Sequence, residues 1–300
     1  MIAVCLCLRS VITSSQSNKT FGRHQMLSAN VHQTFTPFLW GYASVVVRAL
    51  AVIPALGVTL TLLVGCGEAE KKQPAVGAAI TAKSRTCAEG SFRRLGSPRL
   101  AYAAVVRSRA AVSRRPGGRA FASFRRLNVN RVPTIFSIRG ELVDTSCKPT
   151  SYLVQIPKRP NGVTAWLPAR QVTVEKVSTR IVVDLSEKSV TLYKAGKRIL
   201  SSTAAIGAPA TPTPTGRFYV NQRLIPADKR GPFGPGAIGV SAFSDVLTGW
   251  TQGGPIAIHG TNAPWSIGKA VSNGCIRIPN AMLRKLFDQA LGGTPVLIRS

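Results

Sequence analysis

From Leu100 onward the chain is a succession of short β-type runs, and this pattern limits its fold more than any other feature. Apolar and β-branched runs alternate with turns such as Pro116-Gly117-Gly118 and Pro160-Asn161-Gly162. Short strands separated by glycine, proline and asparagine turns are typical of small all-β barrels and sandwiches. We therefore predict a mainly β protein, with its first strands at 102–106, 120–124, 134–138, 152–156 and 165–167.

A second β region begins at Thr179. Alternating apolar residues over 181–185 and again over 190–192 predict a hairpin. One helix is expected over 281–291, because the apolar residues there follow helical spacing and Gly292-Gly293 ends the pattern. Further strands are expected at 199–204, 217–220, 237–241, 256–259, 275–278 and 295–298.

The charge balance is strongly basic, with 39 Lys+Arg against 11 Asp+Glu and a formal net charge of +28. Such a balance suggests a polyanionic neighbour, which could be nucleic acid, anionic lipid or an acidic wall polymer, although a general solubility bias would look the same. Arginine is concentrated over 107–126, whereas residues 179–300 hold 14 basic and 5 acidic residues. The chemistry of the C-terminal region therefore need not involve a polyanion.

The N-terminal part carries an export pattern. Residues 49–65 are uncharged and follow Arg48, which is typical of a secretory signal. The sequence Leu63-Val64-Gly65-Cys66 resembles a bacterial lipobox, which implies lipidation of Cys66 and loss of a leader over 1–65. A transmembrane anchor or a plain cleaved signal is the alternative. Residues 66–98 are polar and aperiodic, so we expect a flexible tether there.

These features predict an exported protein of the cell envelope, held at the outer face of a membrane and facing the wall. Cys87 and Cys147 could form a disulfide, which an oxidising compartment permits. Cys275 is then the odd cysteine of the mature chain, a sign of a reactive thiol. No CxxC pair or histidine cluster occurs in the sequence, so we expect no metal and no other cofactor.

His259 is the only imidazole downstream of the expected leader, and Cys275 follows it by 16 residues. A thiol needs a base nearby to react near neutral pH, and histidine is the usual base. Gly274 lets a substrate approach closely, and backbone N–H groups around it could bind an oxyanion. Singly, each residue could be an ordinary core residue. Together they predict an acyl-transfer enzyme with Cys275 as nucleophile and His259 as general base.

The segments His259-Gly260-Thr261-Asn262, Ser272-Asn273-Gly274-Cys275-Ile276-Arg277 and Asn280 resemble the signature of YkuD-type L,D-transpeptidases. The resemblance extends to Gly207, to 212–218 and to 231–234, and so covers 179–300. The family often has histidine where this chain has Asn273. The resemblance implies a β-sandwich catalytic domain over 178–300 with one or two short helices.

The resemblance also implies a reaction on peptidoglycan stem peptides. Cys275 would attack the L-centre carbonyl of meso-diaminopimelate in a donor tetrapeptide, and D-Ala would leave with a proton from His259. An acceptor diaminopimelate amine, or water, would then resolve the thioester. Arg277 would hold a substrate carboxylate, unless it forms a structural ion pair. Covalent inhibition by carbapenems follows from the same chemistry, and nucleic acid is not an expected partner.

The remaining candidate residues fall into two groups. Those expected to support the site or its oxyanion position are Gly274, Ser272, Asn273 and Gly260. Those expected to contact substrate, besides Arg277, are Thr261, Asn262, Trp265 and Asn280, although Trp265 could instead belong to the core. The competing interpretations are an L,D-carboxypeptidase or cysteine peptidase acting on the wall, and a wall-binding lipoprotein without catalytic activity.

Residues 156–162, followed by 164–169, resemble the end of a bacterial SH3-like domain. In that family a Gly-Trp pair commonly closes the barrel, and here Ala165 stands in place of the glycine. The resemblance implies a small SH3-like β-barrel over 99–177 that positions the catalytic domain or contacts the wall. An unrelated β spacer is the alternative.

Overall fold

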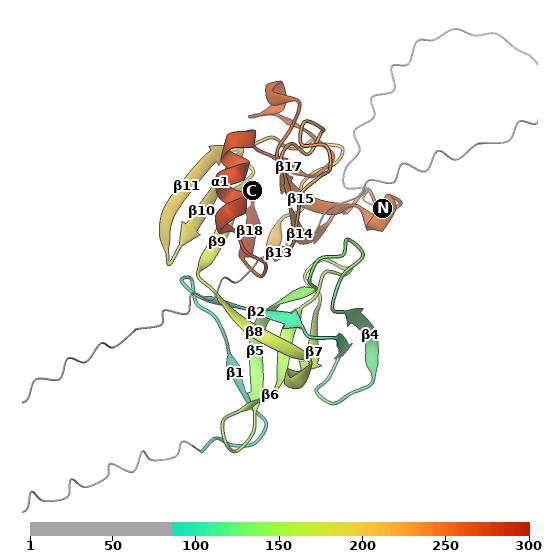
Figure 1. Cartoon of the computed structure of the whole chain (residues 1–300), viewed down its shortest axis with the longest axis vertical. Coiled ribbons are helices and arrows are strands. Elements are labelled where there is room, and N and C mark those ends of the chain that lie inside the picture. Colours follow the sequence, from blue (N-terminus) through green and yellow to red (C-terminus); the bar gives the residue numbers. More distant parts are fainter. Residues whose placement is uncertain (1–85) are drawn as a thin grey trace, which may run out of the picture. The chain divides into compact units, whose positions relative to one another are not determined.

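The computed structural model describes residues 86–300, which belong to one compact unit. Two β-rich regions follow each other along the chain: residues 86–177, called here the upstream module, and residues 178–300, called the C-terminal domain (Figure 1). The prediction of a mainly β protein is confirmed. The expected leader, the lipid site at Cys66 and the tether as far as residue 85 lie outside the described residues.

The upstream module is one curled antiparallel sheet. Its strand order is β4-β3-β7-β6-β5-β2-β8, and β1 pairs with β5. Its core consists of apolar side chains from alternate positions of these strands, including Ala104, Val112, Phe136, Val154 and Leu167. The SH3-like assignment stays a prediction. The strands are β1 Ser91–Arg94, β2 Ala101–Val106, β3 Arg109–Ser113, β4 Ala120–Arg125, β5 Ile135–Val143, β6 Pro149–Gln155, β7 Thr164–Pro168 and β8 Val172–Val177, with a 3-10 turn η1 Ala169–Gln171.

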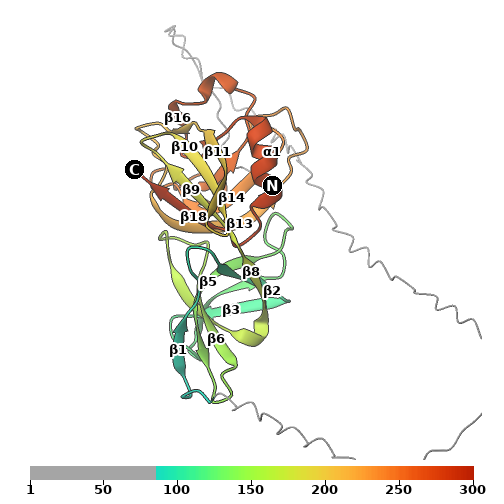
Figure 2. The same ribbon diagram turned by 90° about the vertical axis from the view of Figure 1, so that its left-hand side faces the viewer.

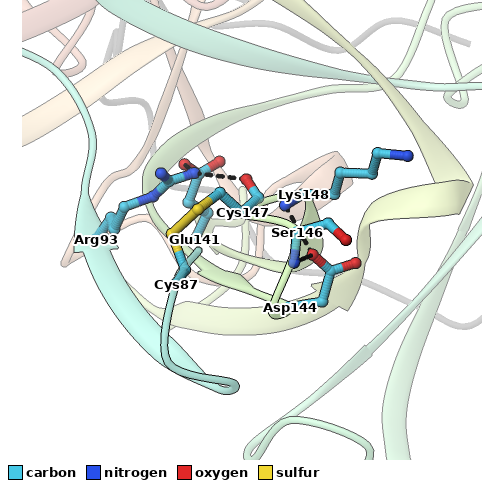
Figure 3. Close-up of a disulfide and its surroundings, with 7 residues drawn as sticks. All are labelled: Cys87, Arg93, Glu141, Asp144, Ser146, Cys147 and Lys148. Atoms are coloured by element: carbon cyan, nitrogen blue, oxygen red, sulfur yellow. Dashed lines mark hydrogen bonds and ion pairs between the residues drawn. A yellow bond between two sulfur atoms is a disulfide. The ribbon is translucent and has the colours of Figure 1, made fainter. Parts of the chain in front are cut away.

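The flexible tether predicted over 66–98 extends too far, because the last part of this range is folded. Strand β1 is part of the sheet, and a disulfide joins Cys87 to Cys147, 60 residues later (Figure 3). The disulfide attaches the start of the module to the turn between β5 and β6. In that turn Asp144 Oδ1 accepts hydrogen bonds from the backbone N–H groups of Ser146 and Lys148, both at 2.9 Å. Folded structure therefore begins about ten residues earlier than the polar composition suggested.

The C-terminal domain contains a mixed sheet in the order β11-β10-β9-β18-β13-β14-β15-β17, with β12 and β16 paired separately. Three strand pairs of the domain are parallel: β18 with β9, β15 with β17, and β12 with β16. The elements are β9 Thr179–Asp184, β10 Ser189–Lys194, β11 Lys197–Thr203, β12 Ile206–Gly207, β13 Gly216–Leu224, β14 Ala237–Phe243, η2 Thr251–Gly253, β15 Pro255–His259, η3 Pro264–Ser266, β16 Ala270–Ser272, β17 Ile276–Arg277, α1 Asn280–Gln289 and β18 Pro295–Arg299.

The two halves of this sheet enclose a single core, which makes the domain a sandwich as predicted (Figures 1 and 2). Ile181 and Leu192 from one half lie in the same buried cluster as Val240 and Ile258 from the other. Helix α1 adds buried leucines to this cluster, which explains its helical apolar spacing. The core fixes the positions of β15 and β17, which carry or adjoin the candidate catalytic residues.

Hydrogen bonds connect the upstream module to the C-terminal domain. The Asn130 amide donates to Gln222 Oε1 at 2.8 Å, and the Arg159 guanidinium donates to the Gly253 carbonyl at 2.8 Å. Asn161 forms two hydrogen bonds with the backbone of Phe243, at 2.8 and 2.9 Å. Among residues 86–300, no helix is long and apolar enough to cross a membrane.

Candidate active site

The parallel pairing of β15 and β17 brings the two predicted catalytic residues to one region of the sheet. In this register Ile258 is opposite Ile276, and His259 is opposite Arg277. Because side chains alternate between the faces of a sheet, Cys275 at the start of β17 falls on the same face as His259. Cys275 is 1% exposed and His259 is 2% exposed. The Cys275 side chain is thus shielded from solvent, next to strand β15, which carries His259.

His259 has one ring nitrogen bound and the other available. Its Nδ1 lies 2.5 Å from the carbonyl oxygen of Gly260, so in the neutral ring Nδ1–H donates this hydrogen bond. Its Nε2 is buried and has no hydrogen-bond partner in the structure. Burial, opposed by the Gly260 hydrogen bond and assisted by the positive charge of Arg277, lowers the pKa of His259 to about 4. The imidazole is therefore neutral near pH 7, with its Nε2 lone pair ready to accept a proton.

Phe233 forms part of the wall around both residues. Its ring packs edge-on against the His259 ring at a centroid distance of 5.1 Å. It also lies in one small apolar cluster with Cys275, Ala237 and Ala257. These contacts exclude water from the imidazole and so cause its low pKa. Phe233 lies in the 231–234 segment that resembles the family signature, but no role was predicted for it.

The loop that presents Cys275 is held by hydroxyl groups. The buried Ser272 hydroxyl donates to the Cys275 carbonyl at 2.5 Å and accepts from the Gly274 N–H at 3.2 Å. The Thr213 hydroxyl donates to the Gly274 carbonyl at 2.9 Å and accepts from the Gly207 N–H at 2.9 Å. Gly274 has a φ of 100°, which disfavours residues with a side chain. These bonds fix the peptide planes on both sides of Cys275.

Thr213 and its neighbour Thr211 are supporting residues that sequence reasoning missed. Thr211 donates to the Ser272 carbonyl at 2.9 Å, and so anchors the same loop from a distant part of the chain. The available signal was the 212–218 segment, which the resemblance included without assigning a function to any residue. Hydroxyl groups that satisfy buried backbone atoms leave no periodic pattern in a sequence, so their partners were not predictable.

Asn280 acts on the loop after His259. Its side chain accepts from the Thr261 N–H at 2.8 Å and donates to the Thr261 carbonyl at 3.1 Å. A side chain at Gly234 or Gly260 would collide with the Asn280 amide oxygen. In this structure Asn280 therefore positions the backbone of Thr261 and Gly260, and the substrate contact expected for it stays a prediction.

The other predicted residues are more accessible. Asn262 is exposed, while Asn273 and Arg277 are half-buried. Trp265 is 57% exposed and packs near the Lys269 ammonium at 5.6 Å, so it is not a core residue. Arg277 stands beside His259 in the strand register, where its charge lowers the pKa of the histidine. These side chains can reach a bound molecule, whereas Ser272 and Thr213 cannot.

The arrangement is suited to thiol chemistry. Within the part of the chain that the structure describes, no group of three or more histidine, cysteine or acidic residues is placed to hold a metal ion. The thiol of Cys275 lies 4.0 Å from the Pro255 carbonyl oxygen and is not part of a disulfide. A buried cysteine, a neutral imidazole with an available lone pair, and a fixed backbone around the nucleophile are the parts needed for acyl transfer.

Comparisons with known proteins agree with this geometry. The family profile described as the L,D-transpeptidase catalytic domain, YkuD, matches residues 178–298. YkuD of Bacillus subtilis is 38% identical over 119 residues, which cover 39% of this chain and 64% of that protein. YqjB of the same organism is 32% identical over 137 residues, which cover 42% of this chain and 69% of that protein.

Among solved structures, a mutant of the Enterococcus faecium L,D-transpeptidase aligns with 27% sequence identity and a TM-score of 0.32. The alignment covers 40% of this chain and 49% of that one. The chain spans about two thirds of the length of its Bacillus relatives. The chain therefore belongs to the YkuD-type L,D-transpeptidase family, and residues 178–298 form its catalytic domain.

Proposed function

We propose that this protein is a peptidoglycan L,D-transpeptidase that works through a thioester on Cys275. The observation that carries the proposal is the buried Nε2 of His259, which has no hydrogen-bond partner. His259 ends β15, and β15 pairs with β17, the strand that directly follows Cys275. A buried polar atom left without a partner is costly, so its presence needs an explanation. Accepting the proton of the Cys275 thiol would supply one.

In the first half-reaction the Cys275 sulfur attacks the carbonyl at the L-centre of diaminopimelate in a donor tetrapeptide. The thiol proton passes to His259 Nε2 as the C–S bond forms. The bond to the terminal D-Ala then breaks, and the imidazolium gives its proton to the departing amine. The products are D-Ala and a thioester between Cys275 and the shortened stem peptide.

In the second half-reaction the amine of an acceptor diaminopimelate attacks the thioester. His259 takes a proton from this amine and returns it to the cysteine sulfur as the C–S bond breaks. A new amide joins the two stem peptides, and the enzyme regains its starting state. Water in place of the amine would give a free carboxylate instead of a cross-link.

The low pKa of His259 suits both directions of proton transfer. With a pKa of about 4 the imidazole is neutral near pH 7 and can accept a proton when the sulfur attacks. Once formed, the buried imidazolium is a strong acid and readily protonates the leaving amine.

The loop of Cys275 supplies the setting for the negatively charged intermediate. Thr213 and Ser272 hold the carbonyl groups of Gly274 and Cys275, and so fix the orientation of the intervening backbone for an oxyanion. Arg277, half-buried beside His259, is suited to bind a stem-peptide carboxylate through its planar guanidinium. Asn262 and Trp265 are exposed and can contact the rest of the peptide.

We also propose that the protein acts outside the cytoplasm as a lipoprotein anchored through Cys66. The support is the uncharged run over 49–65, which follows Arg48. The Leu-Val-Gly-Cys sequence stands at the end of this run, with its cysteine at Cys66. The Cys87–Cys147 disulfide is consistent with an oxidising compartment. Peptidoglycan, the proposed substrate, is found there.

The deciding experiment is product analysis with purified tetrapeptide muropeptides. Dimers joined through an L,D bond, with release of D-Ala, are the expected products. Trimmed peptides without dimers would favour the carboxypeptidase alternative, and unchanged muropeptides would contradict both. In parallel, incubation with a carbapenem should raise the intact mass by one drug molecule, and the Cys275→Ala variant should stay unmodified.

A further inference from the structure

The hairpin formed by β3 and β4 carries a hollow that the proposed catalytic reaction does not use. Its volume is about 450 Å³, and it is lined by Arg114, Arg115, Gly118, Arg119, Ala120 and Phe121. Three of these six residues are arginines, and none is acidic. The whole hairpin from 109 to 126 contains six arginines and no acidic residue. The hollow is thus a concentrated positive site.

The three guanidinium groups are not used to hold the hairpin together. The turn is closed by backbone atoms, because the Gly118 N–H and the Ser113 hydroxyl both donate to the Arg115 carbonyl, at 3.1 and 2.6 Å. The ion pairs of the described residues, Arg93–Glu141 and Arg299–Asp184, lie elsewhere. All three arginines of the hollow are exposed. Their charges are therefore available to a ligand.

The other end of the hairpin repeats the pattern. Arg109 and Arg125 are directly opposite each other in the strand register, and like charges in cross-strand positions are destabilising. Strand β4 runs from the hollow at Phe121 to Arg125, and these four residue steps correspond to about 13 Å of edge strand. The arginines repel one another at both ends of this exposed hairpin. A bound anion that reaches both ends would offset the repulsion. The spacing fits an extended chain with several charges better than a single ion.

We propose that this hairpin binds a phosphodiester polymer of the cell envelope, with successive phosphates at the Arg114–Arg119 hollow and toward Arg109 and Arg125. The planar guanidinium matches phosphate oxygens in a bidentate way. Phe121 is 38% exposed, with the Arg114 guanidinium 5.4 Å from its ring centroid, and offers an apolar surface to the carbon units between phosphates.

Two other polyanions fit the hairpin less well. A bilayer presents a flat face of headgroups, whereas the arginines line a concave hollow. Single-stranded nucleic acid is usually bound by a series of exposed aromatic rings. Here Phe121 is exposed, but Phe124 packs against Phe136 at 5.0 Å in the module core. The hairpin thus has the charges of a phosphate-binding surface without a platform for stacking bases.

The test measures binding of the full chain to poly(glycerol phosphate) at several salt concentrations. The variant Arg114→Gln/Arg115→Gln/Arg119→Gln should bind at least about tenfold more weakly, with a salt dependence of log K shallower by about two units. The matched control Arg94→Gln/Arg99→Gln/Arg170→Gln removes three exposed arginines elsewhere in the module and should change affinity less than threefold. Activity on soluble muropeptides should be unchanged in both.

A second variant keeps the charge and tests the geometry. Arg114→Lys/Arg115→Lys/Arg119→Lys should lose affinity too, because ammonium groups cannot bind phosphate in the bidentate way. Equal losses in the glutamine variant and its control would overturn the proposal in favour of net charge alone. Tighter binding to anionic vesicles or to single-stranded oligonucleotides than to the polymer would also overturn it.

Discussion

The upstream module presents its arginines to solvent, whereas the C-terminal domain buries the polar groups that carry its chemistry. Residues 86–177 hold 17 basic and 4 acidic residues, and six of the arginines belong to one exposed hairpin. In the C-terminal domain His259, Ser272 and Thr213 are at most 4% exposed. A buried group has a specific partner or a specific chemical task, because its desolvation must be offset. An exposed charge acts over a surface and is screened by salt.

The two regions are also stabilised differently. The C-terminal domain has a large apolar core that joins both halves of its sheet to α1. The upstream module has a smaller core, supplemented by the Cys87–Cys147 disulfide. Small domains with limited apolar burial often depend on such cross-links. Changes in the C-terminal domain should therefore alter activity first, and changes in the upstream module should alter stability or binding.

The largest effect expected is that of Cys275→Ala. Removing the nucleophile should lower the rate of L,D-dimer formation at least about a thousandfold. The unfolding free energy should change by only about 1 kcal/mol, since the replaced side chain is small. Muropeptide analysis and urea unfolding measure the two quantities. Residual dimer formation near the normal rate would contradict the role of Cys275.

The double variant Cys87→Ser/Cys147→Ser should show the opposite pattern. Loss of a cross-link over 60 residues is expected to lower the free energy of unfolding by about 4 kcal/mol. Dimer formation at 25 °C by the folded fraction should stay within about twofold of the original rate, because the disulfide is remote in sequence and structure from β15 and β17. A large loss of turnover without unfolding would show that the two regions are not functionally separate.

The sequence predicted the regular parts of the fold better than the parts that hold the site. The runs around 102–106 and 256–259 correspond to β2 and β15, and the 281–291 helix corresponds to α1, because their apolar periods are clear. Strands β3 and β8 were missed, since Arg109 and the polar residues Thr173, Glu175 and Lys176 interrupt their apolar residues.

The candidate catalytic pair follows from a simple argument: a reactive thiol needs a base, and residues 66–300 contain a single histidine. The supports of that pair were not. Phe233, Thr211 and Thr213 reach the site through long-range contacts that depend on the completed sandwich. Asn280 was predicted as a site residue, but its hydrogen bonds to Thr261, 19 residues away in the sequence, were not predicted.

Protonation of the buried His259 should make both the stability and the activity of the C-terminal domain depend on pH. The pKa of the buried imidazole is about 4, against an ordinary value of 6.5 in the unfolded chain. As the pH falls below 6.5, His259 is protonated in the unfolded chain but stays neutral in the folded protein. The folded state therefore loses, between pH 6.5 and pH 4, the stability that the neutral buried imidazole contributes above pH 6.5. The loss amounts to about 3 kcal/mol. The kcat/KM for dimer formation should fall through the same low pKa.

His259→Gln is the matched variant for this experiment. It removes the titrating group, so its unfolding free energy should depend less on pH between 6.5 and 4 by about 3 kcal/mol. Urea unfolding at closely spaced pH values measures this difference. An acid limb of kcat/KM near pH 6.5 in the unmodified protein would show that the imidazole is not desolvated as the structure indicates.

The smallest effect expected concerns the contact between the two regions. Arg159 donates to the Gly253 and Ser244 carbonyls and lies 5.5 Å from the centroid of the Phe243 ring. Arg159→Gln should lower the unfolding free energy by about 1–2 kcal/mol, because charged hydrogen bonds to buried carbonyls are lost. The neighbouring Lys158 is exposed, so Lys158→Gln should change the unfolding free energy by less than about 0.5 kcal/mol.

The shape of the unfolding curve makes this last comparison informative. If Arg159 and the asparagine contacts join the two regions into one cooperative unit, unfolding should occur in a single transition in the original protein. In Arg159→Gln the upstream module should then unfold at a lower urea concentration than the C-terminal domain, and two transitions should separate. Equal effects of Arg159→Gln and Lys158→Gln would mean that the regions are joined by the chain but are energetically independent.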